Sequence, residues 1–183
     1  MKRLICVVLV AFLMCVLVGC DKTPSKPSSN LSGSPAEILN KLVDDTTTAV
    51  KASGKDMYMS TTTDITSKTS QNEIGLSAAD FEKYVTAASS SMAAIGSQAH
   101  EIVLIQAKDA DSAAAVKKIV AGKDGYNPQK WICVWPQKVV VIDSGNYVLI
   151  VASRADIVEA ALNTFKDMAG SVGEADQIYE HME

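Results

Sequence analysis

The chain has 183 residues, of which 48% are hydrophobic and 21% are charged, and its formal net charge is −4. This length leaves room for one domain and a short tether. The mild acidity argues against a nucleic-acid partner, because contacts with phosphates need a basic surface. We therefore expect no nucleic-acid-binding function.

The first residues have the pattern of an export signal. Lys2 and Arg3 give a positive start, and the uncharged, mostly apolar segment 4–18 follows. A positive start, a short apolar segment and small residues at its end are typical of a cleaved signal peptide. The alternative is an uncleaved membrane anchor, because the uncharged segment 4–20 reaches the lower limit of the roughly 17–25 residues that span a bilayer.

The end of this segment, Leu17-Val18-Gly19-Cys20, resembles the lipobox of bacterial lipoproteins. The resemblance implies cleavage between Gly19 and Cys20, so that residues 1–19 are the signal peptide. It also implies a diacylglyceryl group on the Cys20 thiol, as in other palmitate-bearing lipoproteins. Two or more acyl chains hold a protein stably, at ~0.8 kcal/mol per buried CH₂. The expected location is the extracytoplasmic face of the cell membrane, with the lipid as the membrane contact.

Three regions are predicted beyond the signal. Residues 20–33 comprise the lipidated cysteine and a Ser-, Lys- and Pro-rich stretch, which we expect to be a flexible tether. A single α+β domain is expected over residues 34–170. Residues 171–183 form a C-terminal tail, with at most a frayed turn.

The domain is expected to begin with a helix from Pro35 to about Val50. Ser34 at the cap, Pro35 at the first helical position and Glu37 three residues after the cap form a capping box. The following Ser- and Thr-rich segment 55–72 fits a short edge strand and a solvated loop equally well.

The middle of the chain contains one clear strand and one clear helix. Residues 101–107 are a short, largely apolar run with β-branched side chains, which predicts a buried strand. Asp109 is expected to cap a helix from Ala110 to about Ala121. A second cap signature lies at 76–80, whereas the periodicity of residues 86–99 does not separate helix from strand.

A β-hairpin and a final helix are expected next. The β-branched segments Val139–Asp143 and Tyr147–Ala152 flank Gly145-Asn146, which is a strong hairpin signal. The cap signature Ser153–Asp156 then predicts a helix that ends at about Ala169.

Several short motifs resemble a known family when they are taken in order. They are Glu101-Ile102-Val103 opening a strand, Lys108-Asp109 entering a helix, Tyr126-Asn127-Pro128, and Gly145–Leu149 before a strand. This order is similar to a family of small, uncharacterised lipoproteins of Gram-positive anaerobes, known as a domain of unknown function, over roughly residues 34–164. The resemblance implies a strand from Tyr84 to about Ser91, paired with residues 101–107. It implies no catalytic residue, and the connection 122–126 is shorter than is usual in the family.

The elements then follow the order α-β-β-α-β-β-α along the chain. This order predicts an α+β two-layer sandwich, with an antiparallel sheet of about four strands and helices packed on one face.

The sequence offers few residues for metal or cofactor chemistry. His100 and His181 are the two histidines, and Cys133 is the one cysteine beyond residue 20. Because metal sites usually take three or four such ligands, we expect no metal and no cofactor. Cys133 can pair with another chain, but we favour a buried position in which it acts as a small hydrophobe. The common nucleophile, zinc-protease and phosphate-loop motifs do not occur.

Four aromatic residues form a candidate binding face: Tyr126, Trp131, Trp135 and Tyr147. Aromatic side chains with a flat apolar face and a polar edge suit sugars and peptides. If residues 131–135 form a strand, then Trp131, Cys133 and Trp135 face the same way. The alternative, which we favour, is that this face belongs to the core.

The predicted function is therefore a membrane-anchored, non-catalytic binding or interaction module, with an envelope protein or a cell-wall component as its partner. The alternative is a small envelope hydrolase that uses carboxylates brought together by folding, about 5–10 Å apart. The sequence predicts no oligomeric state.

Overall fold

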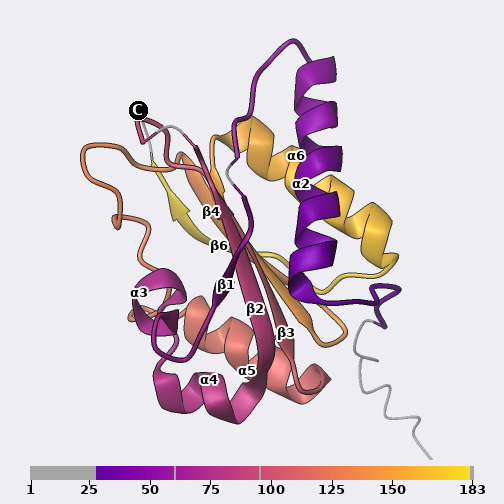
Figure 1. Cartoon of the computed structure of the whole chain (residues 1–183), viewed down its shortest axis with the longest axis vertical. Helices are drawn as coiled ribbons and strands as arrows, with labels where there is room; N and C mark the ends of the chain where they lie inside the picture. Colours follow the sequence, from indigo (N-terminus) through magenta and orange to yellow (C-terminus); the bar gives the residue numbers. More distant parts are fainter. Residues whose placement is uncertain (1–27, 60, 95, 182–183) are drawn as a thin grey trace, which may run out of the picture.

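The computed structural model describes residues 28–59, 61–94 and 96–181 (Figure 1). The predicted signal peptide, the cleavage site at Gly19, the lipid site Cys20 and most of the tether lie outside these residues. Among the residues that are described, no helix is both long enough and apolar enough to cross a membrane.

The centre of the fold is one antiparallel sheet of six strands in the order β1-β2-β3-β5-β4-β6. The strands are β1 (Thr63–Ile65), β2 (Val85–Met92), β3 (Glu101–Ala107), β4 (Lys138–Ser144), β5 (Tyr147–Ser153) and β6 (Asp176–Glu180). The two inner strands, β3 and β5, pair with each other, so that Glu101 lies opposite Ala152. The predicted α+β class and antiparallel sheet are confirmed, although the sheet has more than the expected four strands.

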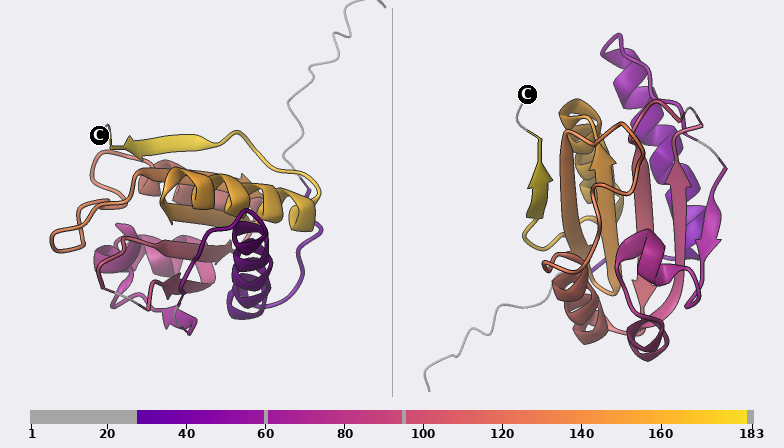
Figure 2. Two further views of the ribbon diagram at one scale, coloured as in Figure 1. Left: turned by 90° about the horizontal axis from the view of Figure 1, so that it is seen from above. Right: turned by 90° about the vertical axis from the view of Figure 1, so that its left-hand side faces the viewer.

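Helices cover both faces of the sheet (Figures 1 and 2). The described helices are α2 (Pro35–Ala52), α3 (Ser70–Ile74), α4 (Ala78–Tyr84), α5 (Ala110–Val120) and α6 (Ala155–Ala169). The helices α2 and α6 share one hydrophobic cluster with the sheet, while α3, α4 and α5 pack against the opposite face. The prediction of two layers with helices on one face is wrong.

Helices cover both faces because the inner strands carry apolar side chains on both faces. Val103 and Ile105 enter the cluster with α5, whereas Ile102 and Leu104 enter the cluster with α2 and α6. A strand that is covered on both faces reads as a continuous apolar run, without alternation of polar and apolar residues. Residues 101–107 have this pattern, and so do β4 and β5.

The expected helix caps are largely present. The Glu37 amide donates to Ser34 Oγ (3.3 Å), and the Ser34 amide donates to Glu37 Oε2 (3.0 Å), which completes the capping box of α2. Asp109 caps α5 by accepting from the Ser112 amide (2.7 Å). The cap prediction for α6 is wrong in detail, because Ser153 is the last residue of β5 and the cap position belongs to Arg154.

Three segments whose structure the sequence left open or predicted as irregular contain strands that pair with a neighbouring strand of the sheet. The strand implied by the family resemblance is present as β2, directly after α4. The Ser- and Thr-rich segment 55–72 contributes β1, which pairs with β2. The predicted tail contains β6, which pairs with β4, so the expectation of a frayed turn there is wrong.

Residues 131–135 do not form the expected strand but belong to an irregular loop, 127–137. Cys133 has a φ of 67°, in the left-handed region, which a strand does not tolerate. Its side chain is exposed, and the prediction of a buried cysteine is therefore also wrong.

The two ends of the sheet differ. One end, called here the hairpin end, holds the β4–β5 turn, and the first described residues run past it. The Asn30 amide donates to the Ala169 carbonyl (2.9 Å), and the Tyr147 hydroxyl donates to the Gly33 carbonyl (3.1 Å). The other end, called here the loop end, holds residues 93–94 and 96–100 and the loop 127–137, and it lies near the C mark in Figure 1.

Candidate functional site

The loop end contains a pocket of about 310 Å³. Four separate segments of the chain line it. The lining residues are Ser97, Gln98, Ala99, His100, Val134, Trp135, Gln137, Arg154 and His181. They lie far apart in the sequence and meet because β3, β4, β5 and β6 all begin or end here.

His100 is one of the residues that line the pocket. It precedes the first residue of β3, and its ring Nδ1 makes a short hydrogen bond with the hydroxyl of Ser153, the last residue of β5. The side chain is 2% exposed, and its Nε2 is buried without a hydrogen-bond partner. Burial, followed by the nearby positive charge of Arg154, lowers the pKa of His100 to about 4. The imidazole is therefore neutral at neutral pH.

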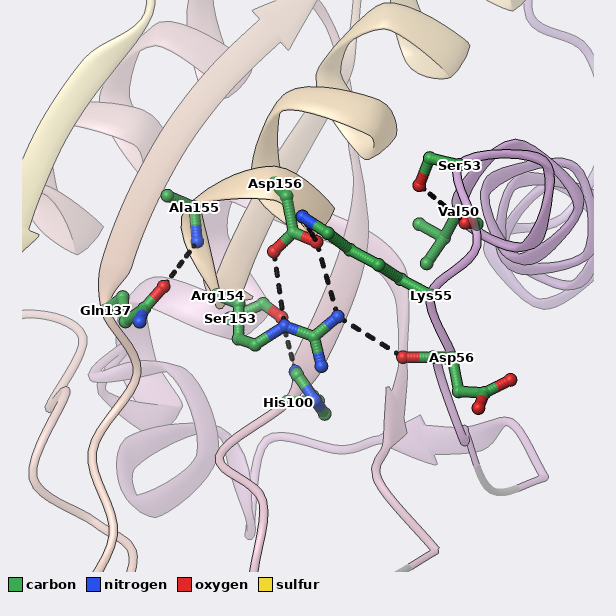
Figure 3. A network of polar contacts seen from close by, with 10 residues as sticks. All are labelled: Val50, Ser53, Lys55, Asp56, His100, Gln137, Ser153, Arg154, Ala155 and Asp156. Atoms are coloured by element: carbon green, nitrogen blue, oxygen red, sulfur yellow. Dashed lines mark hydrogen bonds and ion pairs between the residues drawn. The ribbon is translucent and has the colours of Figure 1, made fainter.

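Arg154 lies beside His100, but its charge is compensated (Figure 3). Its Nε and Nη2 donate to the two carboxylate oxygens of Asp156, at 3.2 and 3.3 Å, and Nη2 also donates to the Asp56 carbonyl at 3.3 Å. Lys55 pairs with the same carboxylate at 2.9 Å. Burial opposes ionisation of Asp156, but the hydrogen bonds from Arg154 and Lys55 outweigh it and lower the pKa to about 2.

The rim of the pocket is aromatic and amide-rich. Trp135 is 49% exposed, and its ring stacks on that of His181 with the centroids 6.1 Å apart. Gln137 Oε1 accepts from the Ala155 amide (3.1 Å), which satisfies one of the free N–H groups at the start of α6. Gln98 Oε1 is buried without a hydrogen-bond partner.

A second polar cluster lies on the opposite face of the sheet. Glu101 is 1% exposed, and its Oε2 accepts from the Tyr126 hydroxyl (2.5 Å) and from the Lys130 ammonium. Burial raises the pKa of Glu101 despite the Lys130 charge. Burial and the Glu101 carboxylate raise the pKa of Tyr126 well above its usual value. Lys130 also lies over the rings of Tyr126 and Trp131, so the cluster fixes the root of the loop 127–137.

The exposed large hydrophobic side chains of the described residues all lie at the loop end. They are Tyr58, Met92, Ile132 and Trp135. Met92 pairs with Glu101 at the end of β2, and Tyr58 precedes Met59, which bridges to Ala93. Ile132 is the most exposed of them, at 88%. Single exposed hydrophobic side chains are common on protein surfaces, but their gathering at one end of the sheet makes this end the candidate binding surface.

The four aromatic residues predicted as a binding face are not brought together. Trp135 lines the pocket, whereas Tyr126 is buried against Glu101 and Trp131 packs partly against the core. Tyr147 lies at the hairpin end, where Gln106 donates to its hydroxyl. The sequence reasoning missed Gln98, His100 and Arg154. The available signal was the pair of ionisable residues His100-Glu101 at the start of a buried strand.

Nucleophilic or acid–base chemistry finds little support in this pocket. Ser153 contacts a histidine nitrogen, but it is 1% exposed and is absent from the pocket lining. The described lining residues include no carboxylate. In the part of the chain that the structure covers, no group of three or more His, Cys, Asp and Glu residues is placed to hold a metal ion.

Carboxylates do meet elsewhere, as the hydrolase alternative requires. Asp143 and Asp176 line a hollow beside α5, where Lys117 Nζ lies 2.8 and 3.6 Å from their oxygens. Because the lysine lies against both carboxylates, it compensates much of their charge. The hydrolase alternative stays a hypothesis.

Comparisons with known proteins give no relative: no family model, no curated protein and no solved structure matches the chain. The resemblance to uncharacterised lipoproteins therefore stays a prediction.

Proposed function

We propose that this protein is a lipoprotein anchored by Cys20 at the extracytoplasmic face of the cell membrane, and that its domain is a non-catalytic binding module. The loop end, with its pocket and its exposed apolar side chains, is the proposed binding surface. The partner is a component of the cell envelope.

The observation that carries the proposal is the placement of the two ends of the sheet. Residues 28–33 run past the hairpin end, where Asn30 contacts Ala169. The pocket and the exposed Ile132 and Trp135 lie at the other end. A domain tethered through its N-terminal segment can therefore turn its apolar surface away from the bilayer.

The chemistry of the pocket favours binding over catalysis. A general base works best when its pKa lies near the operating pH, and the pKa of His100, at about 4, is far below neutrality. The guanidinium of Arg154 is engaged by Asp156. The described lining is therefore suited to hold a ligand through hydrogen bonds and an aromatic face.

Two experiments in a bacterial host test the proposal with the full chain. In the first, labelling with a fatty-acid analogue should mark the wild type and be lost in Cys20→Ala. In the second, a photo-crosslinking amino acid replaces Ile132 at the loop end. The matched control is Lys166, which is also exposed but lies near the hairpin end, on α6.

The expected result is a crosslinked envelope component from position 132 and none, or much less, from position 166. Labelling that survives in Cys20→Ala would refute the anchor. Equal crosslinking from the two positions would refute the loop end as the binding surface.

A further inference from the structure

We propose that the ion pair of Glu101 and Lys130 is a proton-operated latch on the loop 127–137. It holds the loop in place while Glu101 is ionised and releases it when Glu101 takes up a proton. The loop carries the exposed Ile132 and Trp135, so the latch controls how these side chains are presented. This regulation rests on the proposed function: a domain outside the membrane meets the external pH directly, and binding at the loop end weakens as that pH falls.

Lys130 joins three parts of the fold at the root of the loop. Its ammonium donates to Glu101 Oε2 on β3, and to the Glu73 carbonyl on α3 at 2.9 Å. It also lies over the rings of Tyr126 and Trp131, 4.7 and 5.2 Å from their centroids. The Tyr126 hydroxyl donates to the same Glu101 oxygen at 2.5 Å. One carboxylate oxygen therefore receives both donors and fixes the first residues of the loop.

The segment between Lys130 and Gln137 is held at its two ends. At the far end, Gln137 Oε1 accepts from the Ala155 amide at 3.1 Å. Between these anchors, Ile132 and Trp135 expose much of their side chains. Segments with few buried apolar contacts open at a low free-energy cost. The loss of the anchor at Lys130 should therefore let this segment move.

Burial makes the ion pair depend on one proton. Glu101 is buried at the start of an inner strand, and among the described residues Lys130 is the one cation that pairs with it. An ionised carboxylate in such a place is costly unless its partner stays close. Burial raises the pKa of Glu101 above its ordinary value of 4.5, although Lys130 opposes this change. Proton uptake removes the charge that attracts the ammonium, and the flexible lysine side chain can then turn toward water.

The other ionisable groups near Glu101 do not act in its place. Tyr126 keeps its proton, because burial and the Glu101 charge raise its pKa well above the usual value. The charge of Glu73 raises the pKa of Glu101 further, but the atom that contacts Lys130 is the Glu73 carbonyl oxygen. His100, the preceding residue, contacts Ser153 and has a pKa of about 4, below that of Glu101.

The two tryptophans of the chain allow a direct test, because Trp131 and Trp135 both lie in the loop. The full chain is labelled with 5-fluorotryptophan, held in detergent micelles and followed by fluorine NMR from neutral pH down to pH 4.5. Trp131→Phe and Trp135→Phe assign the signals. Both signals should move with a common midpoint as the pH falls. His181 stacks on Trp135 and also titrates, so the Trp131 signal should show the same transition in His181→Gln.

Glu101→Gln mimics the protonated carboxyl, because the amide has nearly the same shape and no charge. Its fluorine spectrum should match that of the acidic wild type at every pH. The matched control is Glu73→Gln, which removes a neighbouring carboxylate but keeps the carbonyl that holds Lys130. It should keep the transition, with a slightly lower midpoint. The double variant Glu101→Gln/Lys130→Met contains no buried charge without a partner, so it should fold and show the same released loop.

The effect on binding is measured with the crosslinking amino acid at position 132 in cells. At neutral pH the crosslinking yield should fall several-fold in Glu101→Gln and stay at the wild-type level in Glu73→Gln. Thermal unfolding of each variant confirms that the domain remains folded.

Fluorine signals of the wild type that do not change with pH would overturn the latch, and so would a transition that survives in Glu101→Gln. An unchanged crosslinking yield in Glu101→Gln would overturn its control of binding. The spectra require no partner. A wild type that shows the transition but gives no crosslink from position 132 would therefore contradict the proposed function and support the latch.

Discussion

His100 and Glu101 are consecutive residues whose side chains enter opposite faces of the sheet, and each carries one buried atom without a hydrogen-bond partner. His100 contacts Ser153 on the face of α2 and α6, and Glu101 contacts Tyr126 on the face of α5. The start of β3 therefore joins the pocket to the cluster that holds the loop 127–137.

His100 should make the stability of the protein depend on pH. Its pKa is about 4 in the folded state and about 6.5 in the unfolded state. Between these values the unfolded chain binds a proton that the folded protein does not, so stability falls as the pH is lowered from 6.5 to 4. At roughly 1.4 kcal/mol per pH unit, the loss is about 3 kcal/mol. Denaturant unfolding of the wild type and of His100→Gln across this range measures it.

The difference between these two proteins isolates the histidine, because Glu101 and Asp156 titrate in both. A difference that stays constant between pH 4 and 6.5 would show that His100 is not buried in its neutral form.

Lys130 should stabilise the buried carboxylate of Glu101. Lys130→Met leaves that charge without its cation, and breaking a buried pair in this way lowers the free energy of unfolding by about 3–5 kcal/mol at neutral pH. The loss should shrink as the pH falls, because Glu101 then takes up a proton. Lys166→Met, at an exposed position on α6, should change stability by less than about 0.5 kcal/mol. An equal loss at pH 4 and pH 7 would instead indicate lost packing.

The two tryptophans should differ in their effect on stability. Trp135→Ala should change the free energy of unfolding by less than about 0.5 kcal/mol, because the side chain is half exposed at the rim. Trp131→Ala should cost about 1–3 kcal/mol, because this ring packs on the core and beneath Lys130. Thermal unfolding of both variants measures the difference, and equal losses would contradict the structure of the loop 127–137.

Gly75 should tolerate no side chain. It has a φ of 71° at the end of α3, and a Cβ there would lie 2.0 Å from the Gly125 carbonyl oxygen. Gly54 has a similar φ of 77° but open space around it. Gly54→Ala should therefore cost about 1–2 kcal/mol for the backbone conformation alone, and Gly75→Ala should cost more. Gly96→Ala, with open space and no positive φ, is the control for the alanine itself.

The local signals in the sequence were sufficient for much of the fold. The capping box at Ser34, the apolar run of β3 and the Gly145-Asn146 hairpin are each decided by neighbouring residues, and all three appear in the structure. The helices on both faces were missed although the continuous apolar run of β3 already indicated them. β6 depends on its pairing with β4, which no local pattern reveals.

The candidate site was less accessible to sequence reasoning. Trp135 was named, but it was grouped with Tyr147, which the register of β5 places at the other end of the sheet. Gln98, His100 and Arg154 carry no motif, and they meet because the start of β3 and the end of β5 lie at the same edge of the sheet. The alternating pattern of residues 131–135 predicted a strand. Cys133 instead has a left-handed backbone conformation, and the segment is a loop.

The loop end is proposed to bind an envelope component through the pocket. The most direct measurement is the crosslinking yield from position 132 in cells, compared between the wild-type background and Trp135→Ala. The yield in Trp135→Ala should fall to the level seen from position 166, while folding and lipid labelling are unchanged. A yield that is unaffected by the loss of Trp135 would contradict it.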